Sequence, residues 1–138
     1  MNQALHRVSS GTNPHCFACG TSNAFGLRLD FELEAGTAQA EWRPGDAWES
    51  FCGVIHGGIV STVLDEAMSQ AVIGQGWNAR TAELRVRLRS WVSPGERLRV
   101  CGWVTQQRKR EIQTEAKLLD ERGHERAHAW GKFLIVQP

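Results

Sequence analysis

The sequence predicts one α+β domain in which an antiparallel sheet of about five to six strands wraps around one long central helix, residues about 57–75. The chain has 138 residues, enough for a single core. Apolar and polar residues alternate in several stretches, whereas one segment repeats its apolar residues every three or four positions. Hairpin-length connections in the second half make the sheet antiparallel, and a helix is needed to cover its apolar face.

The first elements follow from composition and then from alternation. Residues 1–26 are rich in Ser, Thr, Asn, Gly and His without an apolar period, which predicts an extended or loop-like lead-in to a domain at 27–138. Alternation over Leu27–Leu33 and Ala38–Trp42, with a turn at Ala35-Gly36, predicts a hairpin. Pro44-Gly45 ends the second strand, and a loop follows.

The helix is predicted where Ile59 to Val72 place apolar residues at helical steps, and Gly74 and Gly76 end it. Four more alternating stretches complete the sheet, around Leu84–Leu88, Leu98–Val104, Ile112–Leu118 and His124–Val136. Long strands with an exposed edge favour pairing with a second copy. We therefore expect a homodimer with a continuous sheet, which could pair further into a dimer of dimers.

Composition excludes several classes of function. The net charge is +1, with 41% hydrophobic and 22% charged residues, which argues against disorder and against nucleic-acid binding through bulk charge. No uncharged run is long enough to span a membrane, and no secretory signal is visible, so we expect a cytoplasmic protein. Residues 80–110 nevertheless hold nine bases against two acids, which suits either an anionic ligand or a solvated strand face.

Cys16 and Cys19 form a single C-x-x-C, and we expect free thiols rather than disulfides in this setting. A structural zinc would need two more ligands, from a second chain or from His6, His15, Cys52 or Cys101. The sequence favours a structural turn closed by Gly20, with no metal among the site residues.

The segment His56-Gly57-Gly58 opens the predicted helix. Two glycines in the first turn leave backbone N–H groups uncovered, where the helix dipole already favours negative charge. These groups can stabilise the oxyanion of a tetrahedral transition state. His56 can cap the helix, hydrogen-bond a ligand or act as an acid or base.

Asp65 lies in the middle of the wide apolar stripe of this helix. An ionised carboxylate is costly to bury without partners, which favours a functional role over a solvent-facing one. Nine residues separate His56 from Asp65, about 900° of rotation and ~13 Å of rise, so one chain cannot bring them together. Two antiparallel helices of a dimer could, which would give two composite sites.

These features together resemble the hot-dog-fold acyl-CoA thioesterases of the PaaI-like type, in the 4-hydroxybenzoyl-CoA thioesterase superfamily. The resemblance rests on His56-Gly57-Gly58 followed by Leu64–Met68, on Cys16–Gly20 with Gly26-Leu27, and on the Ser93–Glu96 turn. It covers nearly the whole chain. It implies hydrolysis of an acyl-CoA thioester to the free acid and coenzyme A, with no cofactor beyond the coenzyme A of the substrate.

The resemblance also implies roles for individual residues. Gly57, with Gly58 behind it, would polarise the thioester carbonyl, and His56 would orient that end of the ligand. Asp65 would attack the carbonyl or activate the hydrolytic water, and Thr81 would help to hold that water. Ser50 stands where many relatives have Asn or Gln. The basic segment would bind the phosphates of coenzyme A, first through Arg85, Arg87, Arg89, Arg108, Lys109 and Arg110.

Three alternatives remain at this point. A hot-dog module could bind acyl-CoA or an acyl-carrier protein without hydrolysis; Ser50 supports this reading and Asp65 argues against it. A hot-dog hydratase would have its Asp ahead of its His, and Asp46 ahead of His56 fits that order poorly. A zinc-stabilised adaptor would rest on Cys16 and Cys19.

Overall fold

The computed structural model describes residues 6–7 and 13–136. Its strands form one antiparallel sheet in the order β1-β2-β3-β5-β6-β7-β4. The elements are β1 (His6–Arg7), β2 (Glu32–Glu34), β3 (Thr37–Trp42), a 3₁₀ turn (Asp46–Trp48), α1 (Gly57–Gly74), β4 (Ala79–Leu88), β5 (Leu98–Arg108), β6 (Glu111–Leu119) and β7 (Glu125–Ile135). The predicted hot-dog architecture, a sheet around one long helix, is confirmed.

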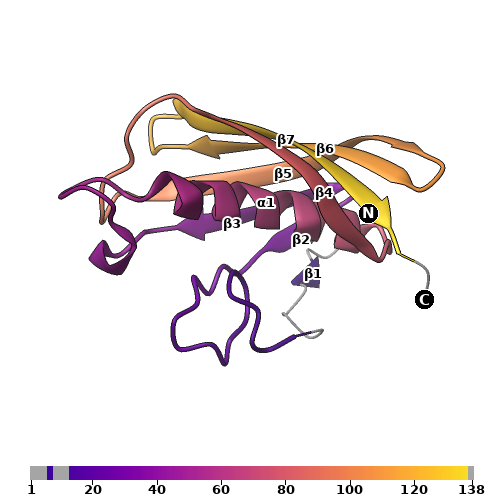
Figure 1. The fold of residues 1–138 in the computed structure, drawn as a ribbon, viewed down its shortest axis with the longest axis horizontal. Helices are drawn as coiled ribbons and strands as arrows, with labels where there is room; N and C mark the ends of the chain where they lie inside the picture. Colours follow the sequence, from indigo (N-terminus) through magenta and orange to yellow (C-terminus); the bar gives the residue numbers. More distant parts are fainter. Residues whose placement is uncertain (1–5, 8–12, 137–138) are drawn as a thin grey trace.

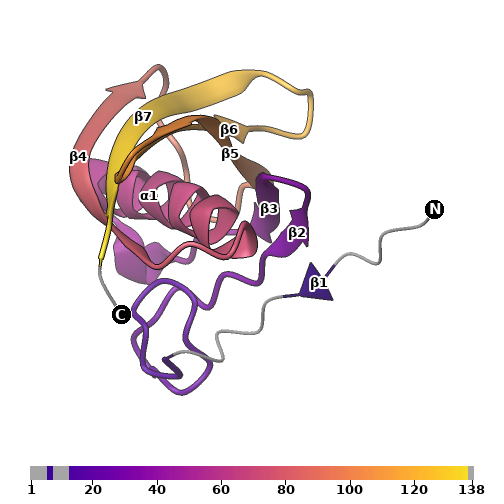
Figure 2. The same cartoon turned by 90° about the vertical axis from the view of Figure 1, so that its right-hand side faces the viewer.

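The sheet curls around α1, which lies along its concave face (Figure 1). Viewed along the helix, β4 and β7 close one side while β3 and β2 close the other (Figure 2). The segment before β2 covers the part of α1 that the sheet leaves open. The helix therefore contacts protein on most sides, which explains its wide apolar stripe.

Two glycines allow the helix to approach the sheet closely. A Cβ at Gly102 on β5 would lie 2.5 Å from the backbone of Ala67 in α1. At Gly131 on β7 it would lie 2.8 Å from Thr114 Oγ1 and 3.0 Å from the Met68 sulfur. Larger side chains at these positions would push α1 off the sheet, and α1 carries the site residues.

The first predicted strand is shorter than its alternation indicates. Leu29 and Phe31 are buried as expected, but only Glu32–Glu34 pair as a strand. The preceding backbone bonds elsewhere, because the Leu27 N–H donates to Phe17 O at 2.8 Å and the Leu29 N–H to Ala18 O at 2.9 Å. Part of the expected lead-in, residues 1–5 and 8–12, lies outside the described residues.

Strand β4 forms an edge of the sheet, with β7 as its sheet neighbour among the described strands. Most of its side chains are exposed, including the large apolar Leu84 and Leu88.

No helix within the described residues is long and apolar enough to cross a membrane.

Candidate active site

The N-terminus of α1 is capped by the residue that precedes it. The Gly58 N–H donates to Nδ1 of His56 at 2.9 Å. Because Nδ1 accepts this bond, the neutral imidazole carries its proton on Nε2, and that atom can donate to a ligand. The cap thus occupies the Gly58 N–H and prepares His56 as a hydrogen-bond donor.

Gly57 keeps its backbone donor available. Within the described residues, no acceptor bonds to the Gly57 N–H. The residue lines an apolar cavity of about 310 Å³ whose wall also includes Ser50, Phe51, Leu88 and Trp91. A donor at a helix N-terminus that opens into an apolar cavity can hold the oxygen of a polarised carbonyl. Ser50 shares this cavity, with its Oγ 3.4 Å from Val54 O.

Asp65 and Thr81 meet between the helix and the edge strand. The Thr81 hydroxyl donates to Asp65 Oδ1 at 2.8 Å, across sixteen residues of sequence. Thr81 lies where the register of β4 against β7 shifts, between Thr81 and Glu83. Such irregularities turn a side chain away from the regular alternation of a strand.

Burial raises the pKa of the Asp65 carboxyl, the Thr81 hydrogen bond partly opposes that rise, and the Glu66 charge adds to it. Within the described residues, no lysine or arginine forms an ion pair with Asp65. A desolvated carboxylate without a neutralising cation is a stronger base than an ordinary aspartate. The arrangement suits proton abstraction or direct attack.

The donor end and the carboxylate lie apart on one helix. Gly57 opens α1 and Asp65 follows eight residues later, which corresponds to ~12 Å along the axis. One small acyl group cannot contact both groups of the same chain. This agrees with the separation that the sequence predicts between His56 and Asp65.

Comparison with known proteins identifies the family. Residues 52–127, more than half of the chain, match the thioesterase superfamily. The chain belongs to the thioesterase superfamily. The matched residues include the helix N-terminus, Asp65 and Thr81. No curated protein sequence matches the chain.

Solved structures of thioesterase-superfamily proteins share the fold. A structure described as a thioesterase superfamily protein has a TM-score of 0.83 at 23% identity over 88% of this chain, which spans 60% of that protein. The PaaI protein of E. coli, from the phenylacetic acid degradation operon, has a TM-score of 0.76 at 19% identity, with 80% of this chain and 81% of that one covered.

A hypothetical thioesterase of Streptococcus pneumoniae TIGR4, solved with coenzyme A, has a TM-score of 0.75 at 15% identity, with 78% of this chain and 85% of that one covered. Two more structures of that protein carry alanine in place of an aspartate and of a threonine. Those two residues are sixteen positions apart, the same spacing as Asp65 and Thr81.

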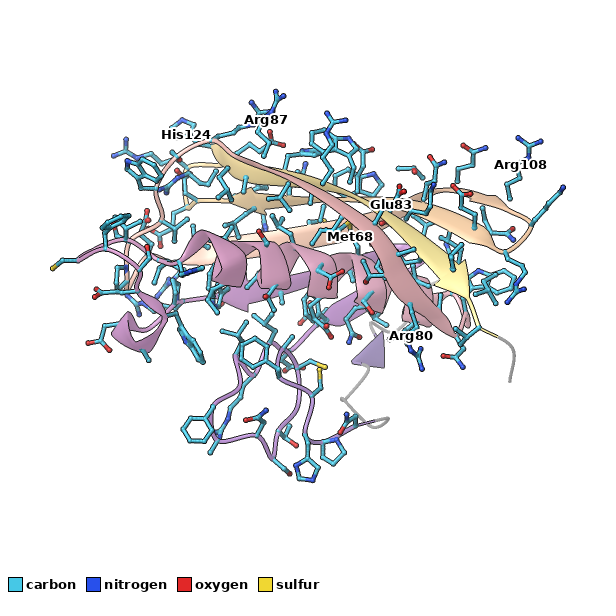
Figure 3. All side chains as sticks on the ribbon, in the orientation of Figure 1. Met68, Arg80, Glu83, Arg87, Arg108 and His124 are labelled. Atoms are coloured by element: carbon cyan, nitrogen blue, oxygen red, sulfur yellow. The ribbon has the colours of Figure 1, made fainter. Side chains whose placement is uncertain are left out.

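In this thioesterase-superfamily chain, the predicted coenzyme A contacts separate into two groups. Arg87 lies at one end of the sheet and Arg108 at the other (Figure 3). On β4, the Arg85 guanidinium lies 4.5 Å from the centre of the Trp130 ring. Directly after β4, Arg89 forms a 2.8 Å ion pair with Glu125. Lys109 and Arg110 accompany Arg108 at the β5–β6 turn, where Arg110 donates to Ile135 O at 3.1 Å.

Next to Asp65, Glu66 faces a different part of the chain. Its carboxylate lies close to the thiols of Cys16 and Cys19, and its Oε1 accepts from Gln70 Nε2 at 2.9 Å. Burial, and after it the Glu66 charge, raises the pKa of the Cys19 thiol. All four cysteines of the chain are free.

Sequence reasoning missed two parts of this region. Phe51 and Leu88 contribute to the cavity wall beside Gly57, but single apolar residues in a loop and at a strand end give no signal of a pocket. Glu66 and Gln70 lie beside the cysteines, and the sequence does contain a signal for this pair. They are four residues apart, so on a helix they lie on the same face.

Proposed function

We propose that this chain hydrolyses an acyl-CoA thioester to a free acid and coenzyme A. The observation that carries the proposal is the half-buried Asp65 carboxylate, which Thr81 holds and which no basic side chain of the described residues neutralises. The thioesterase superfamily and its coenzyme A-bound structural relatives support it. The matching aspartate–threonine spacing in the pneumococcal protein adds to that support.

In the proposed reaction, the Gly57 N–H donates to the thioester carbonyl oxygen, and His56 Nε2 orients the same end of the ligand. A water attacks the carbonyl carbon and gives its proton to Asp65. The tetrahedral intermediate then breaks its C–S bond. Coenzyme A leaves as a thiolate that takes up a proton, and the acyl group leaves as the acid. The reaction uses no cofactor beyond the coenzyme A of the substrate.

Asp65 could instead attack the carbonyl itself and form a mixed anhydride, which water then hydrolyses. A single turnover in ¹⁸O-labelled water with enzyme in excess detects the anhydride route when water attacks the Asp65 carboxyl carbon. A general base, like an anhydride hydrolysed at its acyl carbon, leaves the label only in the released acid. A nucleophile whose own carboxyl carbon is attacked by water acquires the label in Asp65, which mass spectrometry of the peptide detects.

The proposed active unit is a homodimer whose two sites each combine Gly57 of one chain with Asp65 of the other. The separation of these groups on α1 and the exposed edge of β4 with Leu84 and Leu88 support it. Two such dimers could associate further. The active dimer can be tested by mixing inactive variants.

Asp65→Asn and Gly57→Pro chains would each form inactive homodimers. Proline at Gly57, the first residue of α1, removes the proposed N–H donor at a helix position that tolerates proline. Each mixed dimer then has one intact composite site, so random mixing should restore about a quarter of the wild-type activity. No recovery, in a mixture shown by mass spectrometry to contain mixed dimers, would contradict composite sites.

The coenzyme A phosphates are proposed to bind basic residues, and the separation of Arg87 from Arg108 allows each group to be tested alone (Figure 3). We expect replacement of the phosphate-binding group to raise KM for acyl-CoA and to leave a small non-CoA thioester unaffected. Arg87→Ser and the double variant Arg108→Ser/Arg110→Ser are the matched pair. If both change CoA and non-CoA substrates equally, neither group binds the phosphates.

The decisive experiment measures thiol release from short, long and aromatic acyl-CoAs by the wild type and by Asp65→Asn, which keeps shape and removes charge. Turnover that collapses in the variant supports both the activity and the role of Asp65. Binding of acyl-CoA without hydrolysis would instead favour a binding module, the function that the short Ser50 hydroxyl in the cavity favours. The same panel identifies the preferred acyl group.

A further inference from the structure

The segment before β2 forms a tight turn that places two thiols side by side. The Gly20 N–H donates to Cys16 O at 2.9 Å, and the Cys16 N–H donates to Asn13 O at 3.1 Å. A Cβ at Gly20 would lie 2.5 Å from Cys16 N and 2.4 Å from Pro14 O. Only glycine fits there, so the turn depends on Gly20. A C-x-x-C held in such a turn has the spacing of paired metal ligands.

Helix α1 adds a carboxylate to this turn. One ligand atom each from Cys16, Cys19 and Glu66 lies within 4.8 Å of the other two, and all three residues are partly buried. No arginine or lysine of the described chain forms an ion pair with Glu66. The carboxylate therefore lies beside two sulfur atoms without a neutralising cation.

Gln70 adds a buried amide to the cluster. It is 4% exposed and points into the cluster, with Nε2 2.9 Å from Glu66 Oε1 and 3.7 Å from Cys19 Sγ. Its Oε1 is buried without a hydrogen-bond partner. The amide atom that faces the cluster is therefore the donor Nε2, which cannot bind a cation. Half a turn of the amide would bring the acceptor Oε1 to the cluster and move Nε2 into the buried position.

We propose that Cys16, Cys19 and Glu66 bind a Zn²⁺ ion, with the Gln70 amide oxygen as the fourth ligand. Two thiolates and a carboxylate are a donor set that Zn²⁺ accepts in tetrahedral geometry, whereas Ca²⁺ and Mg²⁺ require oxygen ligands throughout. Binding releases the two thiol protons to solvent. The ligands come from the turn and from α1, so the metal fastens the segment before β2 to the helix.

The site has a structural role and does not depend on the proposed hydrolysis. Glu66 faces the cysteines, while Asp65 faces Thr81 on the opposite strand. Metal bound at Glu66 holds the turn of α1 that carries Asp65 without contacting the proposed substrate. The proposal can therefore be tested by metal content and stability alone.

The first test measures zinc in the purified full chain by elemental mass spectrometry. We expect about one zinc per chain in the wild type and less than a tenth of that in Cys16→Ser/Cys19→Ser. The matched control is Cys52→Ser/Cys101→Ser, which removes the two cysteines outside the cluster and should keep its zinc. Zinc that persists without Cys16 and Cys19, or a wild type without zinc in which these cysteines form a disulfide, would overturn the proposal.

A second test uses Co²⁺ as a probe and covers the case in which the cysteine variant does not fold. Co²⁺ added to chelator-treated wild type should give thiolate-to-cobalt charge-transfer absorption and the visible bands of tetrahedral cobalt. Glu66→Gln, which keeps both thiols, should bind Co²⁺ and Zn²⁺ at least ~10-fold more weakly. Chelation should lower the unfolding temperature, and Zn²⁺ should restore it. Absence of the thiolate band, or equal affinity in Glu66→Gln, refutes the site.

Discussion

Asp65 and Glu66 are neighbouring carboxylates on one helix, yet they meet different parts of the chain. Asp65 accepts from the Thr81 hydroxyl on β4, at the edge of the sheet. Glu66 lies against Cys16, Cys19 and Gln70, on the side that the segment before β2 covers. Successive residues of a helix point about 100° apart, so each is served by a separate element. Neither has a basic partner among the described residues.

Under the two proposals, one helix carries a catalytic carboxylate and a metal ligand. The partner of Asp65 is a hydroxyl, which orients the carboxylate and leaves its charge available for proton transfer. The partners of Glu66 are soft sulfur atoms and an amide, which suit a bound cation. The two carboxylates thus differ in their surroundings because different elements face them.

The largest expected effect separates the two carboxylates by activity. Asp65→Asn should lower kcat/KM for the best acyl-CoA by at least ~100-fold, because the general base or nucleophile is lost. Glu66→Gln, assayed with zinc present, should stay within about threefold of the wild type, because Glu66 faces away from the proposed substrate. Equal losses in both variants would show that the two carboxylates act as one site.

The next largest effect on activity is expected from loss of the Thr81 hydroxyl, which donates to Asp65. Thr81→Ala should lower kcat/KM at least about 10-fold, since a hydrogen bond to a charged group contributes roughly 1.5–3 kcal/mol. Thr81→Ser keeps the hydroxyl and should keep most of the activity. Thiol release on the preferred substrate measures both. Full activity in Thr81→Ala would mean that Asp65 is positioned without it.

The sequence alone predicts the helix that carries both carboxylates, but it does not predict all of their neighbours. The helix with its Gly57 opening follows from periodicity, and the proposed role of Asp65 follows from the cost of a carboxylate in an apolar stripe. The pairing with Thr81 came from resemblance, because an irregular register on β4 has no local signal. For the Cys16 and Cys19 pair, the sequence did not indicate Glu66 as a neighbour, because these residues lie about fifty positions apart and the cysteines are in a loop without periodicity.

A smaller effect is expected in stability, with opposite signs for the two carboxylates. Asp65→Asn removes a desolvated charge and should stabilise the fold by about 1 kcal/mol, or roughly 3 °C in the unfolding midpoint. Glu66→Gln should lower the midpoint in zinc-containing buffer, because it weakens the bound state. Thermal unfolding at pH 8 measures both. If both variants shift the unfolding midpoint in the same direction, the two carboxylates do not differ in the way proposed.

The smallest expected effect is on stability, at a carboxylate that does form an ion pair with an arginine. Glu96 accepts from Arg126 at 2.7 and 3.2 Å and from the Ser93 N–H at 2.7 Å, in the loop that carries the cavity residue Trp91. The hydrogen bond from Arg126 holds the pKa of the Glu96 carboxyl below its ordinary value, the opposite of Asp65.

The folded state therefore binds this proton less readily than the unfolded state, so the contribution of Glu96 is present near neutral pH and is lost as the pH falls through its lowered pKa. Glu96→Gln should cost about 0.5–1 kcal/mol at pH 7 and much less in acid, because the pair is partly exposed. Urea unfolding of both proteins from pH 7 to pH 3 checks this. Curves that stay parallel would mean that the Arg126 contact does not depend on the Glu96 charge.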